Sequence, residues 1–249
     1  MIQNDRLRLF TLAAAFLVVV SAHGQEACDE EVKLLLSPTQ VLAAVSALQA
    51  RGEIRGRVYF YDTTALDLLS SGVIFRLRER EEIDLTAKLR PVSGETLVDP
   101  SGGRERYKCE VDLSDGVENQ SFSVQNRYSS AKTPETGTEL RQLRSDGQKK
   151  LLADSKVQID WKRVRRVAGI QSTSWRASGT TPLGNLSLEL WEWPGGSVFE
   201  VWTKVALDAG QATYLELKAL AKKNGLTLSP NQLSKTAIAL QEITAAHRL

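Results

Sequence analysis

Basic side chains recur at every second position in two neighbouring segments of the sequence. Arg76, Arg78 and Arg80 lie at alternate positions of the first segment, and Lys88 and Arg90 do so in the second. Because successive side chains of a strand point to opposite faces, each segment presents its basic side chains on one face. Charges gathered in this way could bind ions of the opposite sign, or they could form ion pairs on an exposed surface.

Acidic side chains are gathered on other segments in the same manner. Asp29 and Glu31 alternate near the start of the chain, and Glu110 and Asp112 alternate further on. The solvent face of an open sheet usually mixes charges with Ser, Thr and Gln, so faces of nearly one sign are unusual. A barrel with a charged, water-filled interior explains the pattern, and so does a salt-bridged outer surface. Periodicity alone leaves both open.

The segments that carry these charges predict one α+β domain with many strands. The apolar content of 42% is enough to bury a sizeable core. Strands are expected over 29–36, 57–63, 73–81, 84–90, 104–114, 157–170, 186–193 and 198–205, with a weak strand or irregular segment over 121–128. Helices are expected from Ser37-Pro38 to Gly52 and over 66–71, 138–153 (one or two), 213–224 and 234–246, with a loop over 93–103.

The first 24 residues have the layout of a secretory signal. Arg6 and Arg8 precede an apolar run over 9–20, and the small residues Ala22 and Gly24 follow it. The run is shorter than the roughly 20 residues needed to span a bilayer, although an uncleaved anchor is the alternative. We therefore expect export to the periplasm or the medium, a single domain over 25–249, and no stable membrane insertion after signal removal.

Two cysteines, Cys28 and Cys109, remain in the mature chain. An even number of cysteines in an exported protein suggests a disulfide, and two unrelated buried thiols are the alternative. Both cysteines have the parity opposite to the charged residues of their segments, so both are expected on the uncharged face. The two histidines lie at opposite ends of the chain. This argues against a structural zinc site and against a histidine-based catalytic triad.

Several short motifs follow one another in a known order. Asp29-x-Glu31-x-Lys33 resembles the E-x-E-x-K signature of the CYTH, or triphosphate tunnel, superfamily. The later segments resemble the family's Y-F-D-T, L-x-L-L-x-x-G and L-R-x-R motifs, its lysine strand, its acidic strand and its late serine–lysine pair. They are Tyr59-Phe60-Tyr61-Asp62-Thr63, Leu66-x-Leu68-Leu69 with Gly72, Phe75-Arg76-Leu77-Arg78-Glu79, Leu85-Thr86-Ala87-Lys88-Leu89-Arg90-Pro91, Glu110-Val111-Asp112 and Ser234-Lys235. The resemblance covers residues 28–245 and is most specific over 57–91.

The resemblance implies an eight-stranded antiparallel closed β-barrel, a tunnel open at both ends, with helices outside. Inward basic residues would hold a small triphosphate or inorganic polyphosphate, because several fixed cations must converge on an anion charged at every phosphate. Carboxylates would hold Mg²⁺ or Mn²⁺, which prefer oxygen ligands. The implied activity is metal-dependent hydrolysis of that substrate. Binding without cleavage and an adenylate-cyclase reaction are the alternatives.

The resemblance also assigns roles to individual residues of this chain. The implied phosphate-binding and catalytic residues are Lys33, Arg57, Arg76, Arg78, Lys88 and one of Arg163, Arg165 and Arg166, of which we choose Arg163. Lys204, Lys235 and Trp202 are further candidates for substrate binding. The implied metal ligands are Asp29, Glu31, Glu189 and Glu200, and Glu110 and Asp112 would balance the charge of the basic strands.

Two positions depart from the family pattern. Asp29 is one methylene shorter than the expected glutamate, and Trp202 stands where the family carries the second glutamate of an E-x-E pair. The tryptophan has three interpretations: a wrong strand register, stacking on an organic group of the substrate, or a weakened metal site in a protein that binds rather than cleaves. The net charge of only +2 and the lack of aromatic residues beside the basic ones argue against nucleic-acid binding.

Overall fold

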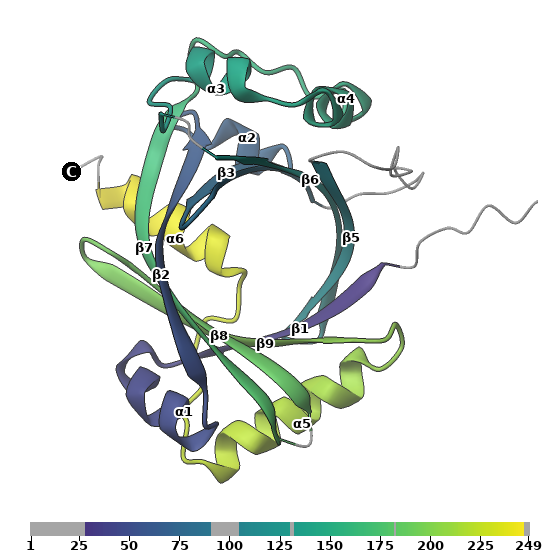
Figure 1. Cartoon of the computed structure of the whole chain (residues 1–249), viewed down its shortest axis with the longest axis vertical. Helices are drawn as coiled ribbons and strands as arrows, with labels where there is room; N and C mark the ends of the chain where they lie inside the picture. Colours follow the sequence, from purple (N-terminus) through teal and green to yellow (C-terminus); the bar gives the residue numbers. More distant parts are fainter. Residues whose placement is uncertain (1–27, 91–104, 130–131, 182, 247–249) are drawn as a thin grey trace, which may run out of the picture.

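The computed structural model describes residues 28–90, 105–129, 132–181 and 183–246. The predicted signal segment and the predicted loop over 93–103 lie outside these residues. The described residues form nine strands that close into a barrel in the order β1-β5-β6-β4-β3-β2-β7-β8-β9 (Figure 1). The strands are β1 (Asp29–Leu36), β2 (Arg51–Asp62), β3 (Val73–Glu79), β4 (Ile83–Leu89), β5 (Glu105–Ser114), β6 (Val117–Tyr128), β7 (Arg165–Thr181), β8 (Gly184–Trp193) and β9 (Gly196–Val205).

The closed barrel is confirmed, but its strand number and pairing differ from the expectation of eight antiparallel strands. The uncertain segment over 121–128 belongs to a full strand, β6, which forms a hairpin with β5 across Asp115 and Gly116. Its mixed polar sequence has little period-two contrast, which is why the sequence predicts it weakly. In addition, β1 pairs in parallel with β5, whereas it pairs antiparallel with β9.

The prediction of a basic strand over 157–170 was wrong in its bounds. The strand β7 begins at Arg165 and continues to Thr181, and Arg163 lies in a turn where its amide donates to the carbonyl oxygen of Asp160 at 3.0 Å. The second half of β7 is rich in Ser and Thr. It is a strand because it pairs with both β2 and β8, a tertiary effect that the local sequence does not report.

Helices cover the outside of the barrel on two opposite sides (Figure 1). On one side, α3 (Gly137–Leu143) and α4 (Asp146–Asp154) bury the apolar outer face of β3, β4 and β6. On the other side, α1 (Val41–Ala47), which follows a 3₁₀ turn at Pro38–Gln40, and α5 (Gly210–Lys223) bury the outer face of β1, β8 and β9. None of the helices in the described ranges is long and apolar enough to cross a membrane.

The last helix, α6 (Lys235–Ala246), packs differently from the others. Ile238 and Leu240 lie in one apolar cluster with Phe60, Ile170 and Trp191. The strand register places these three strand residues on the inward face of the barrel. The expectation that all helices lie outside the barrel is therefore wrong for α6, which fills part of the interior at one end.

The motif Tyr59–Thr63 has a structural role at the start of α2 (Asp67–Ser70). The buried Asp62 carboxylate accepts hydrogen bonds from the amides of Thr63, Leu68 and Leu69 at 2.6–2.9 Å. Gly72 then has a φ of +76°, and a Cβ atom there would meet the carbonyl oxygen of Arg90. Much of the sequence that specifies the resemblance therefore shapes the connection between β2 and β3.

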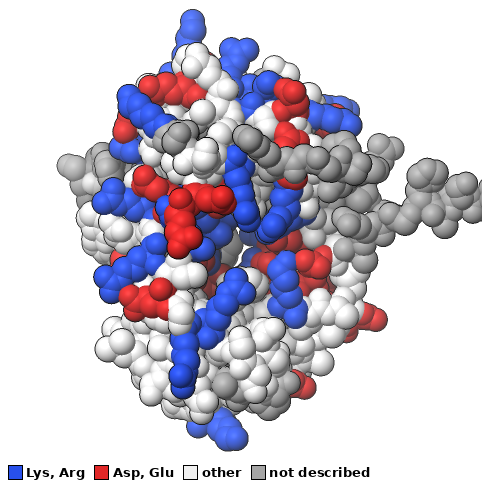
Figure 2. Space-filling model, viewed as in Figure 1, with Lys and Arg blue, Asp and Glu red and all other residues white. Residues whose placement is uncertain are grey.

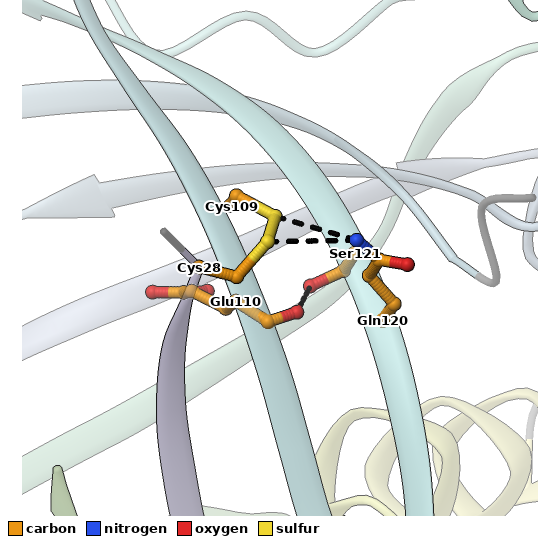
Figure 3. The surroundings of a disulfide bond; sticks show 5 residues. All are labelled: Cys28, Cys109, Glu110, Gln120 and Ser121. Atoms are coloured by element: carbon orange, nitrogen blue, oxygen red, sulfur yellow. Dashed lines mark hydrogen bonds between the residues drawn. A yellow bond between two sulfur atoms is a disulfide. The ribbon is translucent and has the colours of Figure 1, made fainter. Parts of the chain in front are cut away.

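Cys28 and Cys109 form a disulfide, which ties the start of β1 to β5 (Figure 3). The two Cα atoms are 4.6 Å apart, within the usual range for a bonded pair. Both cysteines contact the apolar cluster on the outer face, as their parity predicts, whereas the next residue, Glu110, points into the barrel. The side-chain amide of Gln120 on β6 lies 3.5 and 3.6 Å from the two sulfur atoms.

Removing this disulfide is expected to lower the free energy of unfolding by about 2–5 kcal/mol. The bond joins residues separated by 81 positions, so its loss gives the unfolded chain many more conformations. Chemical denaturation of a Cys28→Ser/Cys109→Ser variant against the oxidised wild type measures the difference. Reductant should produce the same shift in the wild type and none in the variant. If neither the substitution nor the reductant changes the denaturation midpoint, the two cysteines are not bonded in the protein.

Candidate functional site

Two adjoining cavities occupy the barrel interior, one towards each end. Their volumes are about 530 and 280 Å³, and the first is bordered on one side by residues 230–236, which precede and begin α6. Figure 2 shows Lys and Arg side chains gathered around the central hollow, with Asp and Glu beside them. The residues that line both cavities are Lys33, Arg76, Thr86, Lys88, Glu200 and Lys235. The interior is thus a charged tunnel, as the alternating strands suggest.

The tunnel lining carries more positive than negative charge. Within the described ranges, ten Lys and Arg residues and six Asp and Glu residues line the two cavities, an excess of four positive charges. The whole chain has a net charge of only +2, so positive charge is concentrated in the interior. A partly dehydrated cavity with such an excess favours a multiply charged anion.

Arg76 and Arg78 lie side by side on the inward face of β3. The Nε atoms of both are buried and have no hydrogen-bond partner among the described residues. Burial and the like charge of Arg78 lower the pKa of Arg76 to about 10, although its guanidinium stays charged at neutral pH. Arg78 approaches a carboxylate only at 3.8 Å, at Glu189. These two guanidinium groups therefore have donors to offer an anion in the tunnel.

Lys88 and Lys33 face the acidic residues of β5. The Lys88 ammonium lies 3.1 Å from Glu110 and 3.5 Å from Asp112, and Lys33 contacts Asp112 and lies 3.0 Å from Glu31. Burial and the positive charge of Lys33 lower the pKa of Lys88 to about 7. Although burial opposes ionisation of Glu110, Lys88 and Lys108 hold its pKa well below the usual range. Both acids therefore balance the lysines, as expected.

Lys235 reaches into the tunnel from the first residue of α6. Its ammonium contacts Glu189 and lies 2.6 Å from Glu200, and these two glutamates are directly opposite each other on β8 and β9. Although burial opposes ionisation of Glu189, Lys235 and Arg78 hold its pKa well below the usual range. Arg80 lies 3.6 Å from the same carboxylate, and Ser172 donates a hydrogen bond to it at 2.9 Å.

Asp29, Glu31, Lys204 and Trp202 lie towards the other end of the tunnel. Lys204 lies 2.6 Å from Asp29 and 3.6 Å from Glu31, and the Asp29 side chain is 62% exposed. Trp202 lines the smaller cavity and is opposite Lys33 across β1 and β9. The register of β9 is therefore as predicted, and Trp202 lies on the inward face, at the position where the resemblance implies a carboxylate.

The four carboxylates expected to hold Mg²⁺ or Mn²⁺ are not arranged as a metal site. Glu189 and Glu200 are bridged by Lys235, and Asp29 and Glu31 are bridged by Lys204. Across the part of the chain that the structure describes, no group of three or more Asp, Glu, His or Cys side chains could hold a metal ion. Because the oxygens that would ligate the ion already surround ammonium groups, these residues do not fit the implied metal.

Arg57 and Arg163, two of the expected phosphate-binding residues, lie outside the tunnel. Arg57 is exposed on the outer face of β2, opposite Glu79, because the inward positions of that strand are the apolar Val58 and Phe60. Arg163 is 62% exposed and pairs with Asp67 at 3.2 Å. Arg166 is also outside, where it pairs with Glu135 at 2.8 Å. The predicted roles of Arg57 and Arg163 were therefore wrong.

Four other basic residues line the tunnel that were not predicted as phosphate ligands: Arg80, Arg90, Lys108 and Arg176. Arg80 and Arg90 directly follow β3 and β4, and Lys108 lies on β5, so the correctly predicted alternation of these strands could have identified all three. Arg176 lies in the half of β7 that was not predicted as a strand. Arg90 contacts Asp112, and burial lowers the pKa of Arg80, Arg90 and Lys108.

Comparison with solved structures finds proteins with the same barrel. One from Hippeastrum, named as a candidate adenylyl cyclase and described as having a dominant triphosphatase activity, has a TM-score of 0.57 and 20% identity over 85% of this chain and 94% of that one. A candidate adenylate cyclase from Bacillus halodurans has a TM-score of 0.52 and 15% identity over 84% of this chain and 96% of that one. The sequence matches no protein-family model and no curated protein sequence.

These likenesses establish the fold of the chain. Both neighbours match nearly along their whole length, so the likeness extends over the barrel, its connections and its helices. The protein therefore shares the closed-barrel fold of these two proteins, and a closed barrel is what the order of its motifs predicts. At these identities the chemistry must be argued from the residues of this chain.

Proposed function

We propose that the tunnel binds a linear triphosphate or inorganic polyphosphate and hydrolyses one of its phosphoanhydride bonds. The observation that carries this proposal is the pair Arg76 and Arg78, whose buried Nε atoms lack partners inside a cavity with excess positive charge. The description of the Hippeastrum neighbour as a triphosphatase supports the same substrate class. The export that we infer from residues 1–24 favours tripolyphosphate or polyphosphate over intracellular nucleotides.

The inward cations have complementary roles in this proposal. Arg76 and Arg78 donate paired N–H groups to neighbouring phosphate oxygens, and Lys88 on the adjacent strand β4 and Lys33 on the far wall, on β1, neutralise further charge. The oxygen of one water forms the new bond to phosphorus while the bond from phosphorus to the bridging oxygen breaks. The bridging oxygen leaves with the departing phosphate, and the protons of the water pass to the phosphate products and the solvent. Phosphoryl transfer depends mainly on positioning and charge stabilisation, which fixed cations in a tunnel supply. No step is assigned to a divalent cation, because the carboxylates do not fit one.

Phosphate release from tripolyphosphate by the protein beginning at residue 25 tests this function. We expect release well above the uncatalysed rate, and the assay is run in EDTA, in Mg²⁺ and in Mn²⁺, since the resemblance implies metal dependence. Long-chain polyphosphate and nucleoside triphosphates are compared in parallel. If no substrate releases phosphate under any of the three conditions, hydrolysis is excluded.

Binding without cleavage is the second candidate, and Trp202 favours it. This residue stands on the inward face where the resemblance implies a carboxylate, and the four expected metal ligands are paired with lysines. Calorimetry that shows saturable binding of tripolyphosphate without phosphate release would select this function. Formation of cyclic AMP from ATP would instead select the cyclase alternative, and chromatography of the products distinguishes it from hydrolysis.

A further inference from the structure

Two lysines occupy the places where the tunnel was expected to hold divalent metal. Lys235 lies between Glu189 and Glu200, and Lys204 lies between Asp29 and Glu31. These pairs are the four carboxylates that the resemblance assigns to Mg²⁺ or Mn²⁺. Each pair therefore already has a cation, supplied by the chain itself.

The position of Lys235 is fixed by the fold. It is the first residue of α6, which is anchored in the barrel by Ile238, Leu240 and Ile243. Its side chain is only 11% exposed, and its ammonium lies 4.8 Å from the ring centroid of Trp191. The two glutamates are held opposite each other by the pairing of β8 with β9. The contact therefore joins rigid elements and differs from an exposed ion pair between flexible side chains.

A divalent ion and the ammonium groups compete for the same oxygens. Mg²⁺ binds oxygen at about 2.0–2.1 Å and demands nearly complete octahedral coordination. Lys235 would have to leave first, since two cations that share these carboxylates repel each other strongly in a partly buried site. Trp202 removes a further oxygen donor from the inward face of β9, next to Glu200 along that face.

We propose that Lys235 and Lys204 are built-in cations that replace the divalent metal, so that the tunnel binds its anion without Mg²⁺ or Mn²⁺. The ammonium groups neutralise the carboxylates and leave Arg76 and Arg78 available to the phosphates. The identity of the anion rests on the proposed function, whereas the replacement of the metal is a property of the protein alone and can be measured without any substrate.

Calorimetric titration of the protein with Mn²⁺, without phosphate ligands, tests the replacement directly. The wild type is expected to show no saturable binding up to about 1 mM. A Lys235→Ala variant should bind Mn²⁺ at least about tenfold more tightly, because the oxygens of Glu189 and Glu200 are released, and adding Glu189→Gln should abolish this gain. Saturable binding by the wild type that is lost in Glu189→Gln alone would overturn the proposal.

Circular dichroism would detect misfolding of the Lys235→Ala variant. A second variant, at Lys204, keeps the proposal testable if that variant does not fold. Lys204→Ala alters a partly exposed ion pair at the other end of the tunnel and should also gain affinity for Mn²⁺. If both variants fold and neither gains a site, the lysines do not stand in for metal.

Tripolyphosphate binding separates this inference from the proposed function. We expect the affinity of the wild type in EDTA to stay within about twofold of its affinity in Mg²⁺. Binding that requires Mg²⁺ would overturn the inference and leave the proposed function intact. Absence of binding under both conditions would overturn the proposed function, and the Mn²⁺ titration would still decide the role of the lysines.

Discussion

A double variant Arg76→Ala/Arg78→Ala is expected to bind tripolyphosphate at least about 100-fold more weakly than the wild type. A hydrogen bond to a charged group contributes about 1.5–3 kcal/mol, so the loss of two such donors corresponds to two decades of affinity or more. Both guanidinium groups line the tunnel and carry a buried Nε without a partner among the described residues. Isothermal titration calorimetry measures the change.

The neighbouring strand provides a matched control. Arg55 and Arg57 also alternate, but they lie on the outer face of β2 and both are exposed. An Arg55→Ala/Arg57→Ala variant loses the same net charge and should keep its affinity within about twofold, because charges on the outer surface are screened by salt. Equal losses in the two variants would show that the protein attracts the anion by its general charge and that the tunnel holds no specific site.

The charged faces could be predicted because strand alternation is a local property. Arg76, Arg78 and Lys88 all point inward as the period-two pattern requires, and their order with the other motifs predicts a closed barrel. The same parity places Cys28 and Cys109 on the outer face, where they are found.

The misplaced Arg57 shows what alternation cannot report. In β2 the inward face is apolar, because Val58 and Phe60 pack against α6 inside the barrel. Arg57 therefore has the outward parity, although the resemblance assigns it to the phosphate-binding site. Which face is inward depends on the packing of a helix nearly 180 residues further along the chain. Local sequence does not contain that information.

The position of Lys235 between two expected metal ligands also could not be predicted from the sequence. A serine–lysine pair at Ser234-Lys235 suggested a substrate contact, and the acidic residues suggested metal ligands. Only the entry of α6 into the barrel brings Lys235 between Glu189 and Glu200. An ion pair between a helix terminus and two strands depends on the tertiary structure, so charge patterning within each segment could not predict it.

Tripolyphosphate binding is expected to weaken as the pH rises from 7 to 9, and Lys88 is the group responsible. Burial and the charge of Lys33 lower its pKa to about 7, so Lys88 loses its positive charge over this range in the free protein. A bound phosphate favours the ammonium form and raises this pKa. The affinity should therefore fall by up to tenfold for each pH unit above the pKa of the free protein.

The sign of the effect on stability follows from the same shift. The pKa of Lys88 in the folded protein is below its value in the unfolded chain, so between these two pKa values the unfolded chain binds more protons. Lys88 therefore makes the free protein more stable as the pH rises from about 7 towards the pKa of the unfolded chain, and its destabilising contribution is fully present below pH 7. Denaturation with and without tripolyphosphate should show ligand stabilisation decreasing over this same range.

A Lys88→Arg variant isolates this contribution, because a guanidinium stays charged throughout the range. Ionisation of tripolyphosphate itself affects both proteins equally, so the ratio of the two affinities reports Lys88 alone. That ratio should move in favour of the variant by about tenfold or more between pH 7 and pH 9. Calorimetry at pH 8 in buffers of different ionisation enthalpy should also show that the wild type takes up more protons on binding than the variant. Identical pH profiles for the two proteins would mean that Lys88 is already fully charged in the free tunnel, and that its neighbours Glu110 and Asp112 outweigh the effect of burial.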